Sequence, residues 1–243
     1  RWDWSRRYPV IRLSFGGGVI QSRAELDRRI LALLRKNQEA LGVRCGDQTD
    51  IVGCFSELIE GAHAATGERV VVLVDEYDKP ILDNITDPEM ARAMRDGLRN
   101  LYSVIKDSDA DIRFAFLTGV SKFSKVSKVS LFSGLNNLKD ITVDARYSAL
   151  CGYTEADLDQ VFAPELARLD REQIRAWYNG YNWLGEAVYN PFDVLLLFDA
   201  RQFCPWWFET GTPTFLVDVL TQRGFFTPRL AHLRADEALL SAF

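Results

Sequence analysis

The sequence contains few of the residues that build metal centres and disulfide frameworks. Among its 243 residues are two histidines and four cysteines, and no two cysteines form a C-x-x-C pair. So few histidines and cysteines at these spacings do not favour a zinc site or a disulfide-stabilised fold. We therefore expect the cysteines to be buried free thiols in a reducing cytoplasm; they are Cys45, Cys54, Cys151 and Cys204.

Long apolar runs and a large excess of charge are also missing. No apolar stretch approaches the roughly 18 residues that a membrane span needs, and residues 1–7 do not form a signal peptide, so we expect a cytoplasmic protein without membrane contact. The formal net charge of -5 disfavours nucleic-acid binding over the whole surface but leaves room for a local basic patch. Because the first residue is Arg1 and not methionine, we expect the chain to be a segment of a longer polypeptide.

A run of five apolar residues organises the rest of the chain. Residues 70–74 are four valines and a leucine, and Asp75 and Glu76 follow them directly. The run is too short for a helix and too uniformly apolar for a half-exposed strand, so it predicts a central strand of a parallel sheet covered on both faces. In open α/β sheets ligands bind beyond the carboxyl ends of the strands, which is where the two carboxylates would lie.

This pattern resembles the Walker B element of P-loop ATPases. In that element the first carboxylate, here Asp75, holds Mg²⁺, usually through water, and the second, here Glu76, polarises the water that attacks the γ-phosphate of ATP. On this stretch alone, an acidic pair that only solvates a strand end explains the residues equally well.

A second strand with a polar end is predicted at residues 112–120. The helix before it begins at an Asp-Pro pair at residue 87 and keeps apolar residues at i, i+4 spacing. A βαβ unit with a right-handed crossover places its two strands parallel in one sheet, so both polar ends face the same crevice. Thr118 and Ser121 then match the polar residue that P-loop ATPases call sensor 1, although hydroxyls at strand ends also commonly bond the backbone.

The segment before the central strand supplies one more strand and two helices. Residues 8–15 alternate well enough for a strand, and the glycine triplet at 16–18 ends it. We interpret the triplet as a flexible turn, because no Gly-Lys-Ser/Thr follows to bind phosphate. A capping-box signature predicts a helix over residues 23–41, and a second helix starts at Asp50 and ends near Gly67.

From residue 146 onward the sequence changes to short helices rich in aromatic residues. Residues 138–143 still predict a strand, and the helices expected after it cover 154–162, 171–178, 191–198 and 213–220. The aromatic side chains could form a stacking surface for bases, but their spacing among leucines and valines favours a small helical core.

Two basic features also stand out. Lys122, Lys125 and Lys128 recur every third residue and would form a basic stripe on a helical turn, either as a solvated face or as a contact for phosphate or nucleic acid. Arg146 is a candidate arginine finger by location only, and we expect it to form a structural salt bridge.

Several of these segments together resemble a bacterial family, the AAA-ATPase-like domain, whose members commonly carry a PD-(D/E)xK nuclease-like domain after it. The matching segments span nearly the whole chain: VDEYDKPI (74–81), LTGVSKFS (117–124), LFSGLNNLKDIT (131–142), CGYTEADL (151–158), WYNGY (177–181), VYNPFDVLLLF (188–198) and WFETGTPTFLV (207–217).

The resemblance implies an α/β fold with two parts. Residues 1–146 would form a partial P-loop NTPase core of the AAA type, a parallel sheet flanked by helices, and residues 147–243 an α-helical, winged-helix-like lid. Family members place a first strand and a Walker A phosphate loop before the segment with which this chain begins, so we expect that loop and the nuclease-like domain to lie outside it. The repeated Lys-Val-Ser at residues 125–130 departs from the usual length of the sensor loop.

For function, the resemblance implies ATP and Mg²⁺ as ligands. Asp75 becomes the Mg²⁺-side carboxylate, Glu76 the base that polarises water, and Thr118 or Ser121 the sensor. The first hypothesis is therefore the Walker B half and lid of an ATP-driven switch, inactive as an isolated piece. The alternatives are a non-hydrolysing adaptor for a partner protein or nucleic acid, and DNA binding by the lysine stripe for an attached nuclease.

Overall fold

The computed structural model describes residues 3, 5–119, 138–207, 221 and 224, and its contacts divide the chain into two compact units. The first contains the described residues up to Leu138 together with Thr221 and Gly224, and the second those from Lys139 to Trp207. The division after Leu138 lies before the boundary expected after residue 146. None of the helices in the described residues has both the length and the apolarity needed to cross a bilayer.

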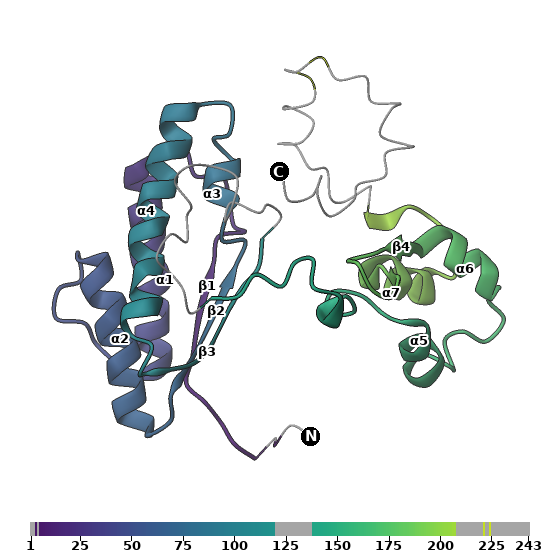
Figure 1. Cartoon of the computed structure of the whole chain (residues 1–243), viewed down its shortest axis with the longest axis horizontal. Helices are drawn as coiled ribbons and strands as arrows, with labels where there is room; N and C mark the ends of the chain where they lie inside the picture. Colours follow the sequence, from purple (N-terminus) through teal and green to yellow (C-terminus); the bar gives the residue numbers. More distant parts are fainter. Residues whose placement is uncertain (1–2, 4, 120–137, 208–220, 222–223, 225–243) are drawn as a thin grey trace. The chain divides into compact units, whose positions relative to one another are not determined.

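The first unit is built on a three-stranded parallel sheet (Figure 1). Its strands are β1 (Val10–Ser14), β2 (Val70–Asp75) and β3 (Ile112–Leu117). β2 lies in the middle, as the valine run predicts, and pairs with β1 on one side and with β3 on the other. The three strands predicted before residue 121 are present, which confirms the α/β assignment.

Four helices accompany these strands. They are α1 (Arg23–Leu41), α2 (Ile51–Thr66), α3 (Lys79–Leu82) and α4 (Pro88–Asp107). The side chains of Ser22, Asp50 and Asp87 each accept a backbone N–H from the first turn of the helix that follows, which satisfies donors that the helix itself cannot. α1 and α2 end at glycines in the left-handed conformation, Gly42 and Gly67.

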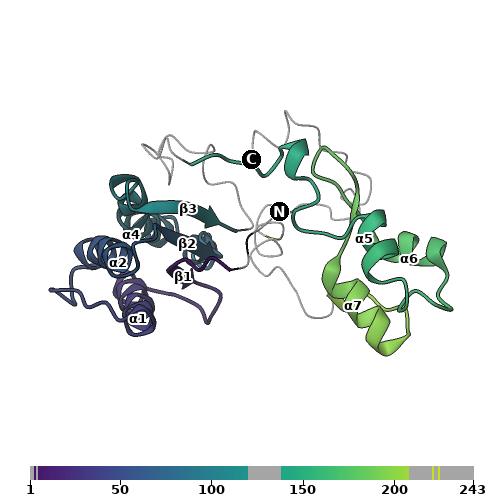
Figure 2. The ribbon, with the colours of Figure 1, turned by 90° about the horizontal axis from the view of Figure 1, so that it is seen from below.

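The three long helices lie on the same side of the sheet (Figure 1 and Figure 2). The connections from β1 to β2 and from β2 to β3 cross the sheet in the same direction, and right-handed connections then place their helices on one face. Strand side chains on that face are almost completely buried against α1, α2 and α4 and form the main core. These strand residues are Ile11, Leu13, Val70, Val72, Val74 and Ile112.

The opposite face of the sheet is less well covered in the described part of this unit. Val71 and Leu73 on β2 are half-buried, and Phe114, which pairs with Val71, is 54% exposed. Phe114 and Phe116 stack with their ring centroids 6.1 Å apart. The sequence predicts a sheet covered on both faces, whereas the described helices of the unit cover one.

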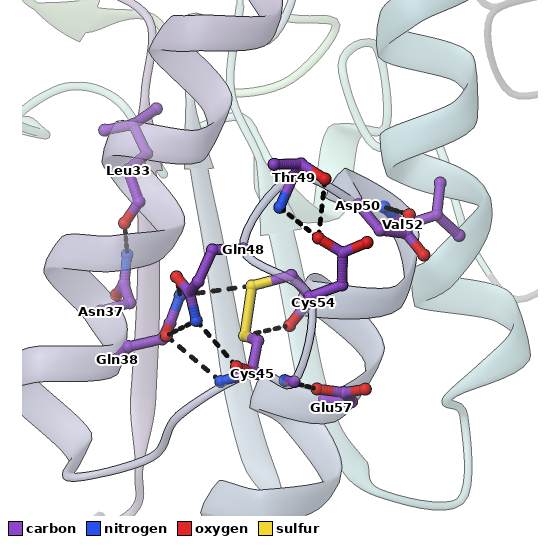
Figure 3. The surroundings of a disulfide bond; sticks show 12 residues. Leu33, Asn37, Gln38, Cys45, Gln48, Thr49, Asp50, Val52, Cys54 and Glu57 are labelled. Atoms are coloured by element: carbon purple, nitrogen blue, oxygen red, sulfur yellow. Dashed lines mark hydrogen bonds between the residues drawn. A yellow bond between two sulfur atoms is a disulfide. The ribbon is translucent and has the colours of Figure 1, made fainter.

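Cys45 and Cys54 form a disulfide bond, which corrects the expectation that both are free thiols (Figure 3). After α1 the chain folds back onto α2, and Gln38 Oε1 accepts hydrogen bonds from the Cys45 N–H at 3.3 Å and from Gln48 Nε2 at 3.0 Å. The pairing depends on this return of the loop. A separation of 9 residues without a C-x-x-C motif carries no local signal for it.

The other two cysteines lie in the second unit. Cys151 is exposed and Cys204 is partly exposed. The expectation of buried thiols is therefore wrong for both.

The second unit consists of short helices and one small sheet. Its elements are η1 (Ala145–Tyr147), α5 (Glu155–Val161), α6 (Arg171–Tyr178), β4 (Asn179–Tyr181), β5 (Val188–Tyr189) and α7 (Pro191–Ala200). The predicted helices corresponding to α5, α6 and α7 are present, and the one at 213–220 lies outside the described residues. The antiparallel pair of β4 and β5 was not predicted, because strands of 3 and 2 residues are too short to show an alternating pattern.

The strand predicted at residues 138–143 is wrong, because residues 138–141 have no regular secondary structure and residues 142–143 form a turn. The Asp140 side chain accepts a hydrogen bond from the Thr142 N–H at 3.0 Å, and such local bonds compete with sheet pairing. Asp144 then forms an ion pair with Arg146 at 2.5 Å. This is the structural salt bridge expected of Arg146.

The aromatic residues of the second unit divide between its core and its surface. Trp177, Tyr181 and Trp183 are 48%, 42% and 39% exposed, so the predicted helical core takes up only part of the aromatic set. The buried residues of that core are Leu158, Ile174, Tyr178, Tyr189, Val194, Leu197 and Phe198.

A charged cluster joins α5, α6 and β5. The Glu155 carboxylate accepts hydrogen bonds from Tyr189 Oη at 2.7 Å, from Arg175 Nε at 2.9 Å and from Arg171 Nη2 at 2.6 Å. Partial burial alone would raise the pKa of Glu155, but the bonds from Tyr189 and Arg175, together with the charges of both arginines, lower it overall.

Candidate functional site

The carboxyl ends of the three strands meet at one edge of the sheet. In the register of the sheet Ser14 on β1 lies opposite Asp75 on β2, and the Phe15 N–H donates to the Asp75 carbonyl at 3.1 Å. On the other side of β2 the Thr118 N–H donates to the Val74 carbonyl at 2.8 Å. The pairing thus continues past the ends of β1 and β3 and carries polar side chains to a common edge.

Asp75 is exposed and lies between two hydroxyl groups. Thr118 Oγ1 donates to Asp75 Oδ1 at 2.9 Å, and Ser14 Oγ donates to Oδ2 at 3.4 Å. The three side chains form a row of oxygen atoms across all three strands. Asp75 and Thr118 were predicted site residues, whereas Ser14 was not. The signal for Ser14 was its place near the end of the strand predicted at 8–15.

Glu76 leaves the sheet in a left-handed backbone conformation, with a φ of 51°. This conformation is uncommon for residues other than glycine and persists only where the surroundings impose it. The side chain lies against Gly16, where an added Cβ atom would be 3.1 Å from Glu76 Oε1. Burial raises the pKa of Glu76, the neighbouring Asp75 carboxylate raises it further, and the Lys79 ammonium partly opposes both.

Residues 16–19, which we call the glycine loop, are tied down through their carbonyl groups. The Arg29 guanidinium on α1 donates to the Gly17 carbonyl, and Lys79 Nζ donates to the Gly18 carbonyl at 2.7 Å. The chain bends at Gly17 and Gly18, as the predicted turn requires, and two cationic side chains link this bend to α1 and α3.

Behind the edge, Tyr77 and Asp78 are buried and fix the start of the segment that follows β3. The Tyr77 N–H donates to the Thr118 carbonyl at 2.9 Å, and the Tyr77 carbonyl accepts from Tyr102 Oη at 3.1 Å. Gly119 packs so closely here that a Cβ atom would lie 2.6 Å from Tyr77 Cε1 and would overlap the Asp78 carboxylate. A side chain at position 119 would therefore force the Tyr77 ring and the Asp78 carboxylate to shift.

A family model described as "Predicted AAA-ATPase" matches residues 1–130, which include the whole strand edge. The chain belongs to this AAA-ATPase-like family. A curated protein of Azotobacter chroococcum mcd 1, described as "Uncharacterized protein in vnfD 5'region", is 71% identical over 243 residues, which make up 100% of this chain and 46% of that protein. The chain thus spans about half the length of the curated relative. No solved structure matches it.

The structure of this AAA-ATPase-like chain brings three of the predicted site residues together. A parallel sheet flanked by helices fits a P-loop-like α/β fold, and Asp75, Glu76 and Thr118 all lie at the carboxyl edge of that sheet. Four residues singled out in the sequence lie outside the described residues: Ser121, Lys122, Lys125 and Lys128.

The oxygen atoms at this strand edge can be compared with the ligands that Mg²⁺ usually takes. Mg²⁺ prefers oxygen ligands and commonly takes one or two carboxylates together with waters and the phosphate oxygens of a substrate. Asp75 offers one exposed carboxylate with hydroxyl groups beside it. Within the described residues there is no group of three or more His, Cys, Asp or Glu that could hold a metal. These residues could supply one carboxylate to a Mg²⁺ ion whose other ligands are waters and nucleotide phosphates. They fit this arrangement better than a metal centre made by protein ligands alone.

Proposed function

We propose that this chain is the part of an ATP-dependent molecular switch that carries its Walker B carboxylates. The observation that supports this most directly is the strand edge, where Asp75 accepts a hydrogen bond of 2.9 Å from Thr118 and Glu76 follows in sequence. Membership of the AAA-ATPase-like family supports ATP as the ligand. ATP hydrolysis would be an activity of the longer protein.

Each residue has its own task in this proposal. Asp75 would hold Mg²⁺ through water, and a metal held there would supply positive charge to the phosphates of ATP. Glu76 would accept a hydrogen bond from the attacking water and so orient and polarise it. Thr118, with Ser121, would act as the sensor, and the Thr118 hydroxyl would also hold the Asp75 carboxylate in one orientation.

The second unit would serve as a winged-helix-like lid in the same proposal. Its described residues form a separate helical core, which supports an independently folded element. ATP binding would close the lid, and hydrolysis would release it. We propose a cytoplasmic switch, and an attached nuclease-like domain is the partner whose action it would control.

The test is ATP turnover by the full-length protein in the presence of Mg²⁺. We expect Glu76→Gln to lower the rate about 100-fold or more while ATP binding is retained, because it removes the group that polarises water. Asp75→Asn should weaken the dependence on Mg²⁺ as well as the rate. Glu39→Gln, an exposed change on α1, is the matched control. Wild-type rates in both site variants would reject the proposal.

A second candidate function is a non-hydrolysing adaptor. It is favoured by the partly covered sheet face, where Phe114 is 54% exposed, since parallel sheets normally bury both faces. A partner protein would suit this apolar face better than nucleic acid, given the net charge of -5. The two functions are separated by one observation: an adaptor binds its partner equally well with and without Mg-ATP.

A further inference from the structure

Lys79 lies beside the proposed ATP site without belonging to it. An ammonium group has three donors, and those of Lys79 are matched by the Gly18 carbonyl at 2.7 Å and by the two Asp83 carboxylate oxygens at 2.8 Å and 2.6 Å. The Lys79 side chain is only 22% exposed. Because its donors are already used within the protein, Lys79 is poorly placed to bind phosphate directly.

The neighbours of Lys79 hold the residue that follows the glycine loop. Asp83 Oδ2 accepts the Ile20 N–H at 3.3 Å, and Asn84 Nδ2 donates to the Ile20 carbonyl at 2.7 Å. Ile20 itself is buried. Lys79, at the start of α3, thus binds Gly18. Asp83 and Asn84, which follow α3, bind Ile20.

The same loop forms the surface on which the Glu76 carboxylate lies. An added Cβ atom at Gly16 would be 3.1 Å from Glu76 Oε1 and 3.3 Å from Cδ, so a side chain at residue 16 would displace the carboxylate from this position. The Lys79 N–H also donates to the Glu76 carbonyl at 3.1 Å. One short segment therefore carries Glu76 and also grips the loop against which Glu76 packs.

We propose that Lys79 is a positioning residue, which holds the glycine loop against the Glu76 side chain and so gives that carboxylate a single orientation above the strand edge. The inference rests on the proposed function, in which Glu76 orients the attacking water. Displacement of a catalytic group by about 1 Å can cost about 100-fold in rate. A lysine that never touches the nucleotide can therefore control turnover through Gly18.

The first measurement compares kcat and KM for ATP in the full-length protein. We expect Lys79→Met to lower kcat about 10- to 100-fold and to leave KM within a factor of about three, because the group lost acts on orientation and not on substrate binding. Lys79→Arg, which keeps a charged donor, should restore much of the rate. Lys36→Met, an exposed change on α1, is the matched control. If Lys79→Met does not fold, Lys79→Gln replaces it.

The second measurement does not depend on ATP hydrolysis. NMR relaxation of the Gly16, Gly17 and Gly18 amides should show order parameters near 0.85 in the wild type and in Lys36→Met, falling toward about 0.6 in Lys79→Met. Unchanged order parameters would overturn the proposal whatever the kinetics show. If the wild-type protein has no ATPase activity, the proposed function is rejected. A glycine loop that becomes more mobile in Lys79→Met would still show that Lys79 holds the loop through the Gly18 carbonyl.

Two kinetic outcomes also count against the proposal. A kcat that is unchanged in Lys79→Met despite a loosened loop would mean that the loop does not position Glu76. A KM that rises while kcat stays constant would mean that Lys79 contributes to nucleotide binding, as a contact with phosphate would.

Discussion

The Thr118 hydroxyl donates a hydrogen bond of 2.9 Å to the Asp75 carboxylate, across two neighbouring parallel strands. On the other side of Asp75 the contact with Ser14 is longer, at 3.4 Å. A hydrogen bond between oxygen atoms is strongest near 2.7–2.8 Å and weakens with distance. The orientation of the Asp75 carboxylate therefore depends more on Thr118 than on Ser14.

Removal of the Thr118 hydroxyl should weaken metal binding. Thr118→Val keeps the shape of the side chain, and we expect the Mg²⁺ concentration for half-maximal ATP hydrolysis by the full-length protein to rise about 10-fold, as for other groups that orient a ligand. The measurement is a Mg²⁺ titration of the rate. Ser14→Ala, which removes the longer contact, should have a clearly smaller effect. Equal effects of the two changes would contradict this assignment.

A side chain at position 119 should destabilise the first unit. In Gly119→Ala the new methyl group would press on the Tyr77 ring and the Asp78 carboxylate, and overpacking of this kind costs about 1–3 kcal/mol. Urea unfolding followed by circular dichroism gives the change in the free energy of unfolding. Gly46→Ala is the control, because its new Cβ atom would have Glu57 oxygens at an ordinary 3.7 Å. Equal stability of the two variants would contradict this prediction, because it would mean that the segment after β3 moves to accommodate the methyl group at no cost.

The Glu155 cluster should make the second unit sensitive to acid. The folded-state pKa of Glu155 is lowered, so its contribution is present above the unfolded-state pKa of about 4.3 and is lost as the pH falls through the lower folded-state value. Glu155→Gln should cost about 1–2 kcal/mol at pH 7 and less at pH 3, so the variant has a flatter pH profile than the wild type.

Tryptophan fluorescence is a suitable probe for this measurement, because four of the six tryptophans lie in the second unit: Trp177, Trp183, Trp206 and Trp207. Glu172→Gln is the control, since Glu172 is 79% exposed and lies 3.6 Å from Arg175. Such a surface pair contributes less than about 1 kcal/mol. A pH profile of Glu155→Gln that runs parallel to that of the wild type would refute the assignment.

The 243-residue chain by itself should bind Mg-ATP weakly and should not hydrolyse it. Its sequence contains no Gly-Lys-Ser/Thr, the element whose backbone and lysine hold the β- and γ-phosphates in P-loop proteins. Isothermal titration calorimetry of the chain and of the full-length protein, side by side, measures the difference. Micromolar affinity of the isolated chain would show that another element binds the phosphates.

Local patterns were sufficient to predict most of the first unit. The uninterrupted valine run placed β2 in the middle of the sheet, and the caps at Ser22, Asp50 and Asp87 predicted the starts of α1, α2 and α4. Parallel pairing followed from the handedness of crossovers, and it brought the ends of β2 and β3 together. Asp75, Glu76 and Thr118 could therefore be assigned to one edge from sequence alone.

Features that depend on contacts between distant segments were not predictable in this way. The Cys45–Cys54 disulfide depends on how the loop after α1 returns to α2. The hydrogen bond from Lys79 to the Gly18 carbonyl joins residues 61 positions apart. No repeating pattern of apolar residues in the sequence indicates such a contact. The strand expected at 138–143 failed because Asp140 and Thr142 bond each other locally, and the sheet of β4 and β5 is too short to leave a pattern.

The direction in which the sheet is wound has one more consequence. β1, β2 and β3 follow one another across it, so their connections fill one face and leave Phe114 on the other. The helix of a right-handed crossover would cover Phe114 only if the crossover ran across the sheet in the opposite direction, from the β3 side toward β1. In open α/β sheets a reversal of this kind creates a ligand crevice at the carboxyl ends of the strands, so a connection of this kind would place the crevice at the edge where Asp75 lies.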